Sequence, residues 1–254
     1  MEEAMTPAEV AAILGAGVGA GTINTIVGSG SLITFPTLLA FGYPPVVANV
    51  SNTVGLVPGS ISGTLGYRRE LAGQRYRILR FGAVAVAGSL TGAVLLLALP
   101  ATTFQRVVPF LILAACLLIA FQPRLSAEVE RRRPRAESHS RLLDLGVYLT
   151  GVYGGYFGAA QGVILIALLA IFVADDLQRL NALKNMIATL VNAVAAVLFI
   201  LVAPVAWPVS LLLAVGSIVG GQLGAVLARR FSPLVLRGFI VVVGTAVAVR
   251  LLLA

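Results

Sequence analysis

Long apolar stretches separated by short polar turns run through almost the whole chain. Several of them approach or exceed the ~20 residues that a helix needs to cross a bilayer. We therefore expect an all-α polytopic membrane protein. The hydropathy pattern predicts ten helical segments, at residues 8–27, 31–42, 46–66, 78–98, 104–121, 142–158, 162–173, 178–203, 208–228 and 234–252.

Two of these segments, 31–42 and 162–173, are too short to cross the hydrocarbon as upright helices. Each follows a glycine-rich stretch, Gly28-Ser29-Gly30-Ser31 in the first case and Gly158-Ala159-Ala160-Gln161-Gly162 in the second. We predict that each is a half-helix that meets the preceding helix at a glycine break. Non-helical backbone within the hydrocarbon layer is tolerated where it is buried in protein or lines a cavity.

The two halves of the chain align on each other, which indicates an internal duplication. The predicted units are a first repeat at 1–121, a linker at 122–141 and a second repeat at 142–254, all within one membrane domain. A shift of 132 residues places Gly30 on Gly162, Asn49 on Asn181, Asn52-Thr53 on Lys184-Asn185, Gly88 on Gly220 and Gly92 on Gly224.

The arginines predict how the chain is oriented. The loop at 68–80 and the linker at 122–141 are basic, so both should be cytoplasmic, whereas the uncharged turns at 100–103 and 203–206 should lie outside. With five segments per repeat, the two repeats are then inverted relative to each other, and both termini lie outside. The net charge of +8 is explained by these loops and does not indicate nucleic-acid binding.

Composition excludes several classes of site. The chain is 59% apolar and 11% charged, far from the composition of a soluble domain. Cys116 is the only cysteine, so the chain cannot form an internal disulfide. His139 is the only histidine and lies in the polar linker, which argues against a histidine-based metal site and a Ser-His-Asp triad. We expect no catalytic residue, no metal and no cofactor. The first ten residues lack a basic stretch, which argues against a cleavable signal peptide.

Lys184 is the only lysine, and it lies within an apolar segment. An ionisable group in hydrocarbon is costly and by default functional. Because no Asp or Glu lies in the middle of another apolar segment, the simplest partner for Lys184 is an anionic substrate. The alternative is that Lys184 lies near the membrane surface and extends its ammonium to the headgroups.

Other polar residues share the expected site. Asn49, Asn52 and Thr53 lie on one helix face at i, i+3, i+4 spacing, and Asn181, Lys184 and Asn185 repeat this spacing. The breaks would add hydroxyls, backbone N–H groups and Gln161, which aligns with Ser29. Alternatively, the asparagines hold helices together; Asn24 and Asn192 are expected to be structural. The predicted binding set is Ser29, Gly30, Ser31, Asn49, Asn52, Thr53, Gln161, Gly162, Asn181, Lys184 and Asn185.

Taken in order, these motifs resemble the TauE/SafE family of membrane permeases, also called the sulfite exporter family. The resemblance covers essentially the whole chain, including the duplication and the basic linker. It implies transport of small sulfur-containing or carboxylate anions, such as sulfite or organosulfonates, across the bacterial cytoplasmic membrane, often in export. The motifs that carry it are Gly15–Gly21, Gly28–Leu32 with Pro36, Ala48–Val54 with Gly59, Gly151–Gly158 and Leu180–Asn185.

The sequence thus predicts a secondary transporter, of the export type, for a small sulfur-containing or organic anion bound at the repeat interface near Lys184. A passive anion channel and a permease for a carboxylate or other non-sulfur anion are the alternatives. An intramembrane enzyme would need a Ser29–Lys184 pair, and a helix break explains Ser29 more simply. The expected partners are the anion and membrane lipid, without nucleic acid. The oligomeric state is left open, a homodimer included.

Overall fold

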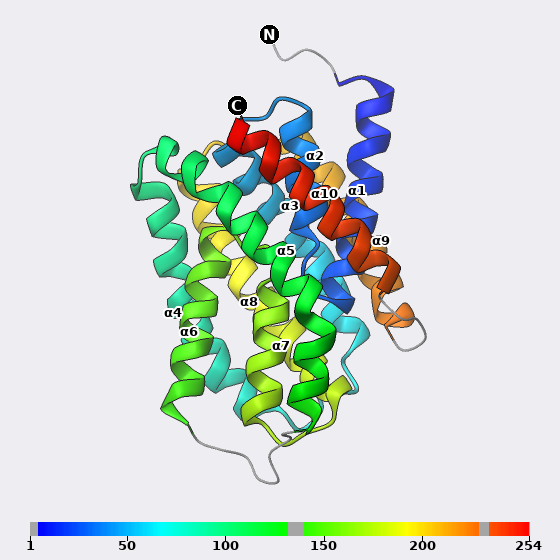
Figure 1. Ribbon diagram of the computed structural model, residues 1–254, viewed down its shortest axis with the longest axis vertical. Helices are drawn as coiled ribbons and strands as arrows, with labels where there is room; N and C mark the ends of the chain where they lie inside the picture. The colour runs from blue at the N-terminus through cyan, green and yellow to red at the C-terminus, as the bar shows by residue number, and fades with distance from the viewer. Residues whose placement is uncertain (1–4, 132–139, 229–233, 254) are drawn as a thin grey trace.

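The computed structural model describes residues 5–131, 140–228 and 234–253, and every element within them is a helix. Ten helices follow one another along the chain (Figure 1): α1 (Pro7–Ile26), α2 (Ser31–Ala40), α3 (Pro45–Gly66), α4 (Arg75–Ala98), α5 (Ala101–Arg131), α6 (Arg141–Tyr156), α7 (Gln161–Phe172), α8 (Leu177–Val202), α9 (Trp207–Leu227) and α10 (Leu234–Leu253).

All ten predicted segments are confirmed, nearly all with ends within a few residues. The main difference is α5, which continues to Arg131, into the predicted polar linker. Hydropathy detects only the apolar part of a helix, whereas the added stretch is polar and includes the helix formers Glu128 and Glu130. Residues 132–139 of the linker lie outside the described part of the chain.

Within the described residues, α1, α4, α5, α8 and α9 are long and apolar enough to cross a membrane. The short helices α2 and α7 have 10 and 12 residues. At 1.5 Å per residue they extend only about 15–18 Å, against a hydrocarbon thickness of roughly 30 Å. Neither can cross alone, which confirms the prediction that both are half-length elements.

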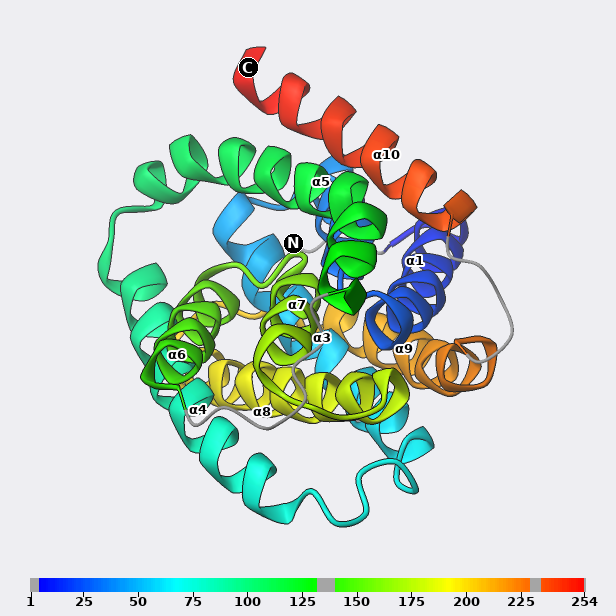
Figure 2. The ribbon, with the colours of Figure 1, turned by 60° about the horizontal axis from the view of Figure 1, so that its bottom comes forward.

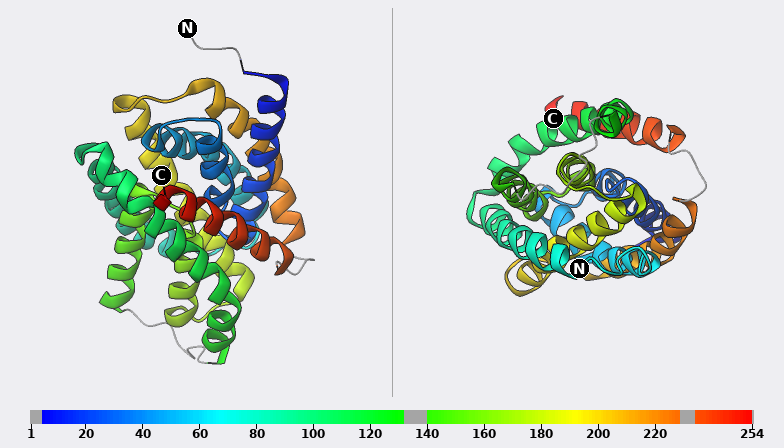
Figure 3. Two further views of the ribbon diagram at one scale, coloured as in Figure 1. Left: turned by 45° about the horizontal axis from the view of Figure 1, so that its top comes forward. Right: turned by 90° about the horizontal axis from the view of Figure 1, so that it is seen from below.

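Helix packing has the same pattern in the two halves of the chain, as expected from the predicted duplication. Helix α1 packs on α9 as α6 packs on α4, and α3 packs on α9 as α8 packs on α4. Helices α3 and α8 pack on each other, and so do α5 and α10. Figure 2 and the right-hand view of Figure 3 show α5 and α10 together along one side of the bundle. This pairing is what two related halves produce; the inverted orientation in the membrane stays a prediction.

Small residues let the paired helices approach closely. A methyl group added at Gly92 of α4 would lie 1.9 Å from the Val152 carbonyl oxygen of α6, and one at Gly88 would lie 2.2 Å from the Tyr148 oxygen. Gly220 of α9 has the equivalent relation to α1. These contacts confirm that the repeated glycines are helix-packing positions.

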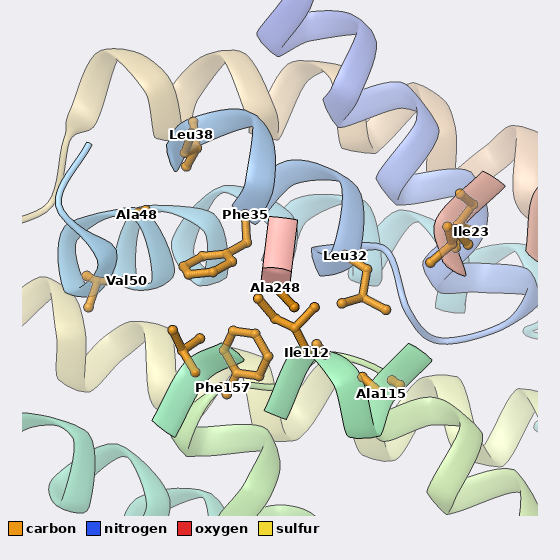
Figure 4. Packing of buried hydrophobic residues seen from close by; sticks show 14 of the residues in the cluster. Ile23, Leu32, Phe35, Leu38, Ala48, Val50, Ile112, Ala115, Phe157 and Ala248 are labelled. Carbon is orange, nitrogen blue, oxygen red and sulfur yellow. The ribbon is translucent and has the colours of Figure 1, made fainter. Parts of the chain in front are cut away.

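An aromatic core holds the two broken regions together (Figure 4). Phe35 of α2 and Phe157, directly after α6, meet edge to face with ring centroids 5.3 Å apart. Ile112 of α5 and Ala248 of α10 belong to the same buried cluster. Helices α5 and α10 therefore cover the contact between α2 and the second break.

A polar cluster links the α3–α4 connection to the α7–α8 connection, at the end of the bundle opposite the start of α1 (Figure 1). Asp175, between α7 and α8, pairs with Arg77 of α4 and with Arg179 of α8. Gln74 donates to the Arg179 carbonyl at 3.0 Å. Burial alone would raise the pKa of Asp175, but hydrogen bonds from Arg77, the Asp176 backbone and Arg179 more than offset it, and the pKa is lowered. We call these four residues, Asp175, Arg77, Arg179 and Gln74, the Asp175 cluster.

Candidate functional site

Both glycine breaks are true interruptions of the backbone. Helix α1 ends at Ile26, and Gly28 then has φ of 88° before α2 begins. Helix α6 ends at Tyr156, and Gly158 has φ of 76° before α7 begins. Positive φ values are readily adopted only by glycine. Ala160, with φ of 61°, is the one non-glycine residue with positive φ among the described residues.

The two breaks touch each other. The Gly162 N–H donates to the Gly28 carbonyl at 3.2 Å. A methyl group added at Gly28 would lie 2.4 Å from the Gly162 Cα, so the backbones are in direct contact. The first turns of α2 and α7, far apart in sequence, are therefore brought to one place.

The breaks correct one detail of the predicted alignment. Ser31 and Gln161 each occupy the first position of their short helix, so Gln161 corresponds to Ser31 rather than to Ser29. Gly30 accordingly corresponds to Ala160, the residue before α7, and not to Gly162 as predicted. The offset there is 130 residues (161 − 31), whereas the starts of α3 and α8 at Pro45 and Leu177 differ by 132. The two additional residues of α7 account for the change.

Side chains from one half bind the backbone end of the broken helix in the other half. Lys184 Nζ and Asn185 Nδ2 of α8 both donate to the Thr25 carbonyl of α1, at 3.4 and 3.2 Å. Asn49 Nδ2 of α3 donates to the Tyr156 carbonyl of α6 at 3.0 Å. Carbonyls at a helix C-terminus lack intrahelical partners, and these side chains supply them.

Lys184 is buried, with 1% of its surface exposed. Its side chain therefore packs inside the bundle, which excludes the alternative in which it extends to the membrane surface. A cation at the C-terminal end of α1 also interacts favourably with the helix dipole. Lys184 does not itself line the cavity described below, although its partner Thr25 does.

The other residues of the two polar faces have different surroundings. Asn52 donates to Ser31 Oγ at 3.1 Å and accepts a hydrogen bond from Thr34. Thr53 bonds to the Asn49 carbonyl of its own helix, and Asn181 donates to the Tyr67 hydroxyl. The bonds of Asn52 and Asn181 join neighbouring helices, which is the structural role given above as the alternative for the asparagines.

A small polar cavity lies where the breaks meet. Of the predicted set, Ser31, Gln161, Gly162 and Asn185 line it. Its volume is about 20 Å³, and a single water needs roughly 10–15 Å³. The remaining lining residues are Asn24, Thr25, Gly28, Ser60, Gly158, Ala188, Thr189 and Asn192.

Several of these lining residues were not predicted as binding residues. Asn185, Thr189 and Asn192 follow i, i+4, i+7 spacing, so they share one face of α8. The 132-residue shift places Ser60 on Asn192, so both halves contribute at an equivalent position. Following the polar face of α8 in the sequence for two turns beyond Asn185 would have identified Thr189 and Asn192.

The remaining predicted residues do not line the cavity: Ser29, Gly30, Asn49, Asn52, Thr53, Asn181 and Lys184. Ser29 Oγ is buried and has no hydrogen-bond partner among the described residues. Lys184 donates to the Thr25 carbonyl, so a Ser29–Lys184 pair of the kind a serine enzyme needs is not assembled.

The cavity faces the N-termini of two helices. Ser31 begins α2 and Gln161 begins α7, and the N-cap residues Gly30 and Ala160 provide no side-chain cap. At the start of α2, Asn24 Oδ1 instead accepts from the Gly30 N–H at 3.0 Å.

The first N–H groups of α7 already donate to backbone carbonyls, that of Gln161 to Gly158 and that of Gly162 to Gly28, so attraction of an anion here relies on the positive ends of the helix dipoles. None of the residues that line the cavity is charged, so helix ends, hydroxyls and amides determine its polarity.

Ten helices, two of them short and entered through glycine breaks that meet inside the bundle, define a multi-pass membrane protein. The family model for the sulfite exporter TauE/SafE matches residues 13–251, so the chain belongs to the TauE/SafE family of membrane transporters. It is a protein of the cytoplasmic membrane.

Curated relatives carry transporter names. A probable membrane transporter protein of Haemophilus influenzae is 30% identical, covering 89% of this chain and 88% of the relative. Probable membrane transporter protein ORF9 of a Sinorhizobium species and YfcA of Escherichia coli K12 are each 28% identical over 92% of this chain, covering 88% and 86% of those proteins. No solved structure gives a significant match.

Proposed function

We propose that the protein is a secondary transporter for a small oxyanion of the size of sulfite, bound where the two breaks meet. The observation that carries this proposal is the cavity where the N-termini of α2 and α7 meet, lined by the first residue of each helix. Broken helices whose N-termini point at an anionic group are the characteristic site of secondary transporters built from repeats.

Neutral donors would bind the anion, and Lys184 would attract it. Ser31 and Asn185 line the cavity and can donate hydrogen bonds to oxygen atoms. Lys184 stands behind Thr25, whose carbonyl it binds. Because the dielectric constant inside the bundle is low, a buried charge would attract an anion in the cavity more strongly than the same charge at the protein surface.

The size of the cavity bears on both substrate and mechanism. A volume of about 20 Å³ favours sulfite over longer organosulfonates, and even sulfite requires the lining side chains to move apart. Inverted repeats provide such movement by rocking one bundle against the other around a fixed site. Because a negative cell interior drives anions outward, export is the direction we expect.

The test is counterflow in proteoliposomes loaded with unlabelled sulfite and presented with labelled sulfite. A carrier exchanges the two, so we expect labelled sulfite to accumulate transiently and only when the inside is loaded. Flux that follows voltage without dependence on loading would indicate the channel alternative. Exchange of acetate but not sulfite would indicate the carboxylate alternative, and exchange of neither would overturn the proposal.

A further inference from the structure

Gln161 is a buried amide without partners. Its side chain is 3% exposed, it lines the cavity, and neither Nε2 nor Oε1 has a hydrogen-bond partner among the described residues. A buried polar group that stays unsatisfied destabilises the protein, so native structures retain few of them. Because both atoms are unpaired, reversing the amide orientation does not change this observation.

The side chain is confined to its place. A methyl group added at Gly154 of α6 would lie 1.9 Å from Gln161 Oε1 and 2.7 Å from Val191 Cγ1. The amide thus occupies a notch that exists because residue 154 is glycine. Gly158, beside the notch, also lines the cavity, so the amide is held at the cavity wall.

The helix ends and Lys184 determine which net charge of a ligand the cavity favours. Each helix end is equivalent to roughly half an elementary charge, positive at the N-terminus and negative at the C-terminus. The C-termini of α1 and α6 end at the same breaks and oppose the positive field of the α2 and α7 N-termini. In its ammonium form, Lys184, bound to the carbonyl of the lining residue Thr25, would add one positive charge beside the cavity, which matches a single negative charge on the ligand.

We propose that Gln161 is a specificity-determining residue that selects a monoanion carrying a hydrogen-bond donor, such as hydrogen sulfite or hydrogen carbonate. Nε2 donates to a charged oxygen of the ligand, and Oε1 accepts the ligand's own hydrogen. A fully deprotonated anion would satisfy Nε2 and leave Oε1 unpaired. This inference rests on the proposed function, since it assumes that an anion occupies the cavity.

The test uses Gln161→Met, which keeps an unbranched side chain of similar length and removes the amide. Purified protein is compared with the variant by thermal melting and by titration with four probes. Hydrogen sulfite is paired with methanesulfinate and hydrogen carbonate with acetate, because each pair has the same charge and a similar shape but differs by a hydroxyl in place of a methyl group.

For the original protein we expect each hydroxyl-bearing anion to bind at least tenfold more tightly than its methyl counterpart. In Gln161→Met this preference should fall to less than about threefold, and the ligand-free melting temperature should be equal or higher because an unsatisfied amide is gone. Gln74→Met is the matched control: its amide is equally buried but bonded to the Glu70 and Arg179 carbonyls. It should melt lower and keep the preference.

An unchanged preference in a folded Gln161→Met protein would overturn the inference, and so would equal binding of both members of each pair by the original protein. A lower melting temperature, as for Gln74→Met, would show that Gln161 has a structural role instead. If the original protein binds none of the four anions, it is the proposed function that fails.

Discussion

At the scale of single residues, Lys184 is held by the end of a broken helix. Its ammonium and the neighbouring Asn185 amide bind the same carbonyl, that of Thr25. The sequence predicted that a lone buried cation needs a partner. It did not predict a backbone carbonyl, because a carbonyl released by a helix break is visible only once two distant segments are placed together.

Replacing Lys184 tests its electrostatic role. We expect Lys184→Met to weaken anion binding at least tenfold, roughly 1.4 kcal/mol, because the positive charge beside the cavity is lost. Lys184→Arg keeps the charge but not the compact ammonium, so binding should be intermediate. Titration calorimetry with protein that stays monodisperse in detergent measures this. Unchanged affinity in Lys184→Met would mean that helix ends and neutral donors suffice.

The cavity residues show why the candidate site was only partly predictable. Polar residues at helical spacing in an apolar segment pointed to α3 and α8, and Ser31, Gln161, Gly162 and Asn185 do line the cavity. Asn52 and Thr53 carry the same sequence signal but bond to neighbouring helices or to their own backbone. Which face of a helix meets a cavity depends on packing, and spacing alone does not contain that information.

At the scale of elements, apolar runs and glycine breaks defined all ten helices, because their lengths are set by bilayer thickness and their breaks by backbone geometry. The end of α5 was missed since its last turns are polar. The offset of 130 at the breaks was also missed, because α7 is two residues longer than α2. Helix ends depend on local contacts, which a hydropathy profile does not record.

Close helix packing gives a stability prediction. Gly92→Ala should destabilise the protein by about 3 kcal/mol, at the upper end for overpacking, because the added methyl meets the Val152 backbone oxygen rather than a movable side chain. Gly15→Ala is the control: nothing lies within 4 Å of the added methyl, and an exposed helical glycine gains up to roughly 1 kcal/mol as alanine. Thermal melting of both variants compares them, and equal effects would contradict the packing account.

The Asp175 cluster gives a pH prediction. The folded pKa of Asp175 is lowered, so its contribution to stability is complete above the ordinary carboxyl pKa and is lost as pH falls through the lowered value. Asp175→Asn should therefore be less stable than the original protein at neutral pH and nearly equal to it in strong acid. Melting curves across this range measure the difference. A constant difference at all pH values would mean that the charge of Asp175 does not matter.

At the scale of the whole molecule, the helix pairs repeat between the halves as the duplication requires. Figure 1 places the start of α1, the α4–α5 turn and the end of α10 at one end, and the start of α6 at the other. The arrangement is compatible with the predicted orientation, in which the first end faces outward. Which end faces the cytoplasm depends on insertion into a membrane, and only the distribution of arginines bears on it.

Cysteine labelling tests that orientation. In a Cys116→Ala background, Thr102→Cys should react with a membrane-impermeant thiol reagent in intact cells, and Arg69→Cys should react only after the membrane is opened. Both positions are exposed in the folded protein, so burial does not explain a difference. The reverse pattern would show that the topology is inverted relative to the prediction.

The central claim is that an anion binds where the two broken helices meet. Its most direct test is an experimental structure with selenite, a heavier analogue of sulfite whose selenium is located by anomalous scattering. We predict one strong selenium peak between Ser31 and Gln161, weaker at the same selenite concentration in crystals of the Gln161→Met variant. Selenium only at surface arginines, or elsewhere in the bundle, would contradict the account.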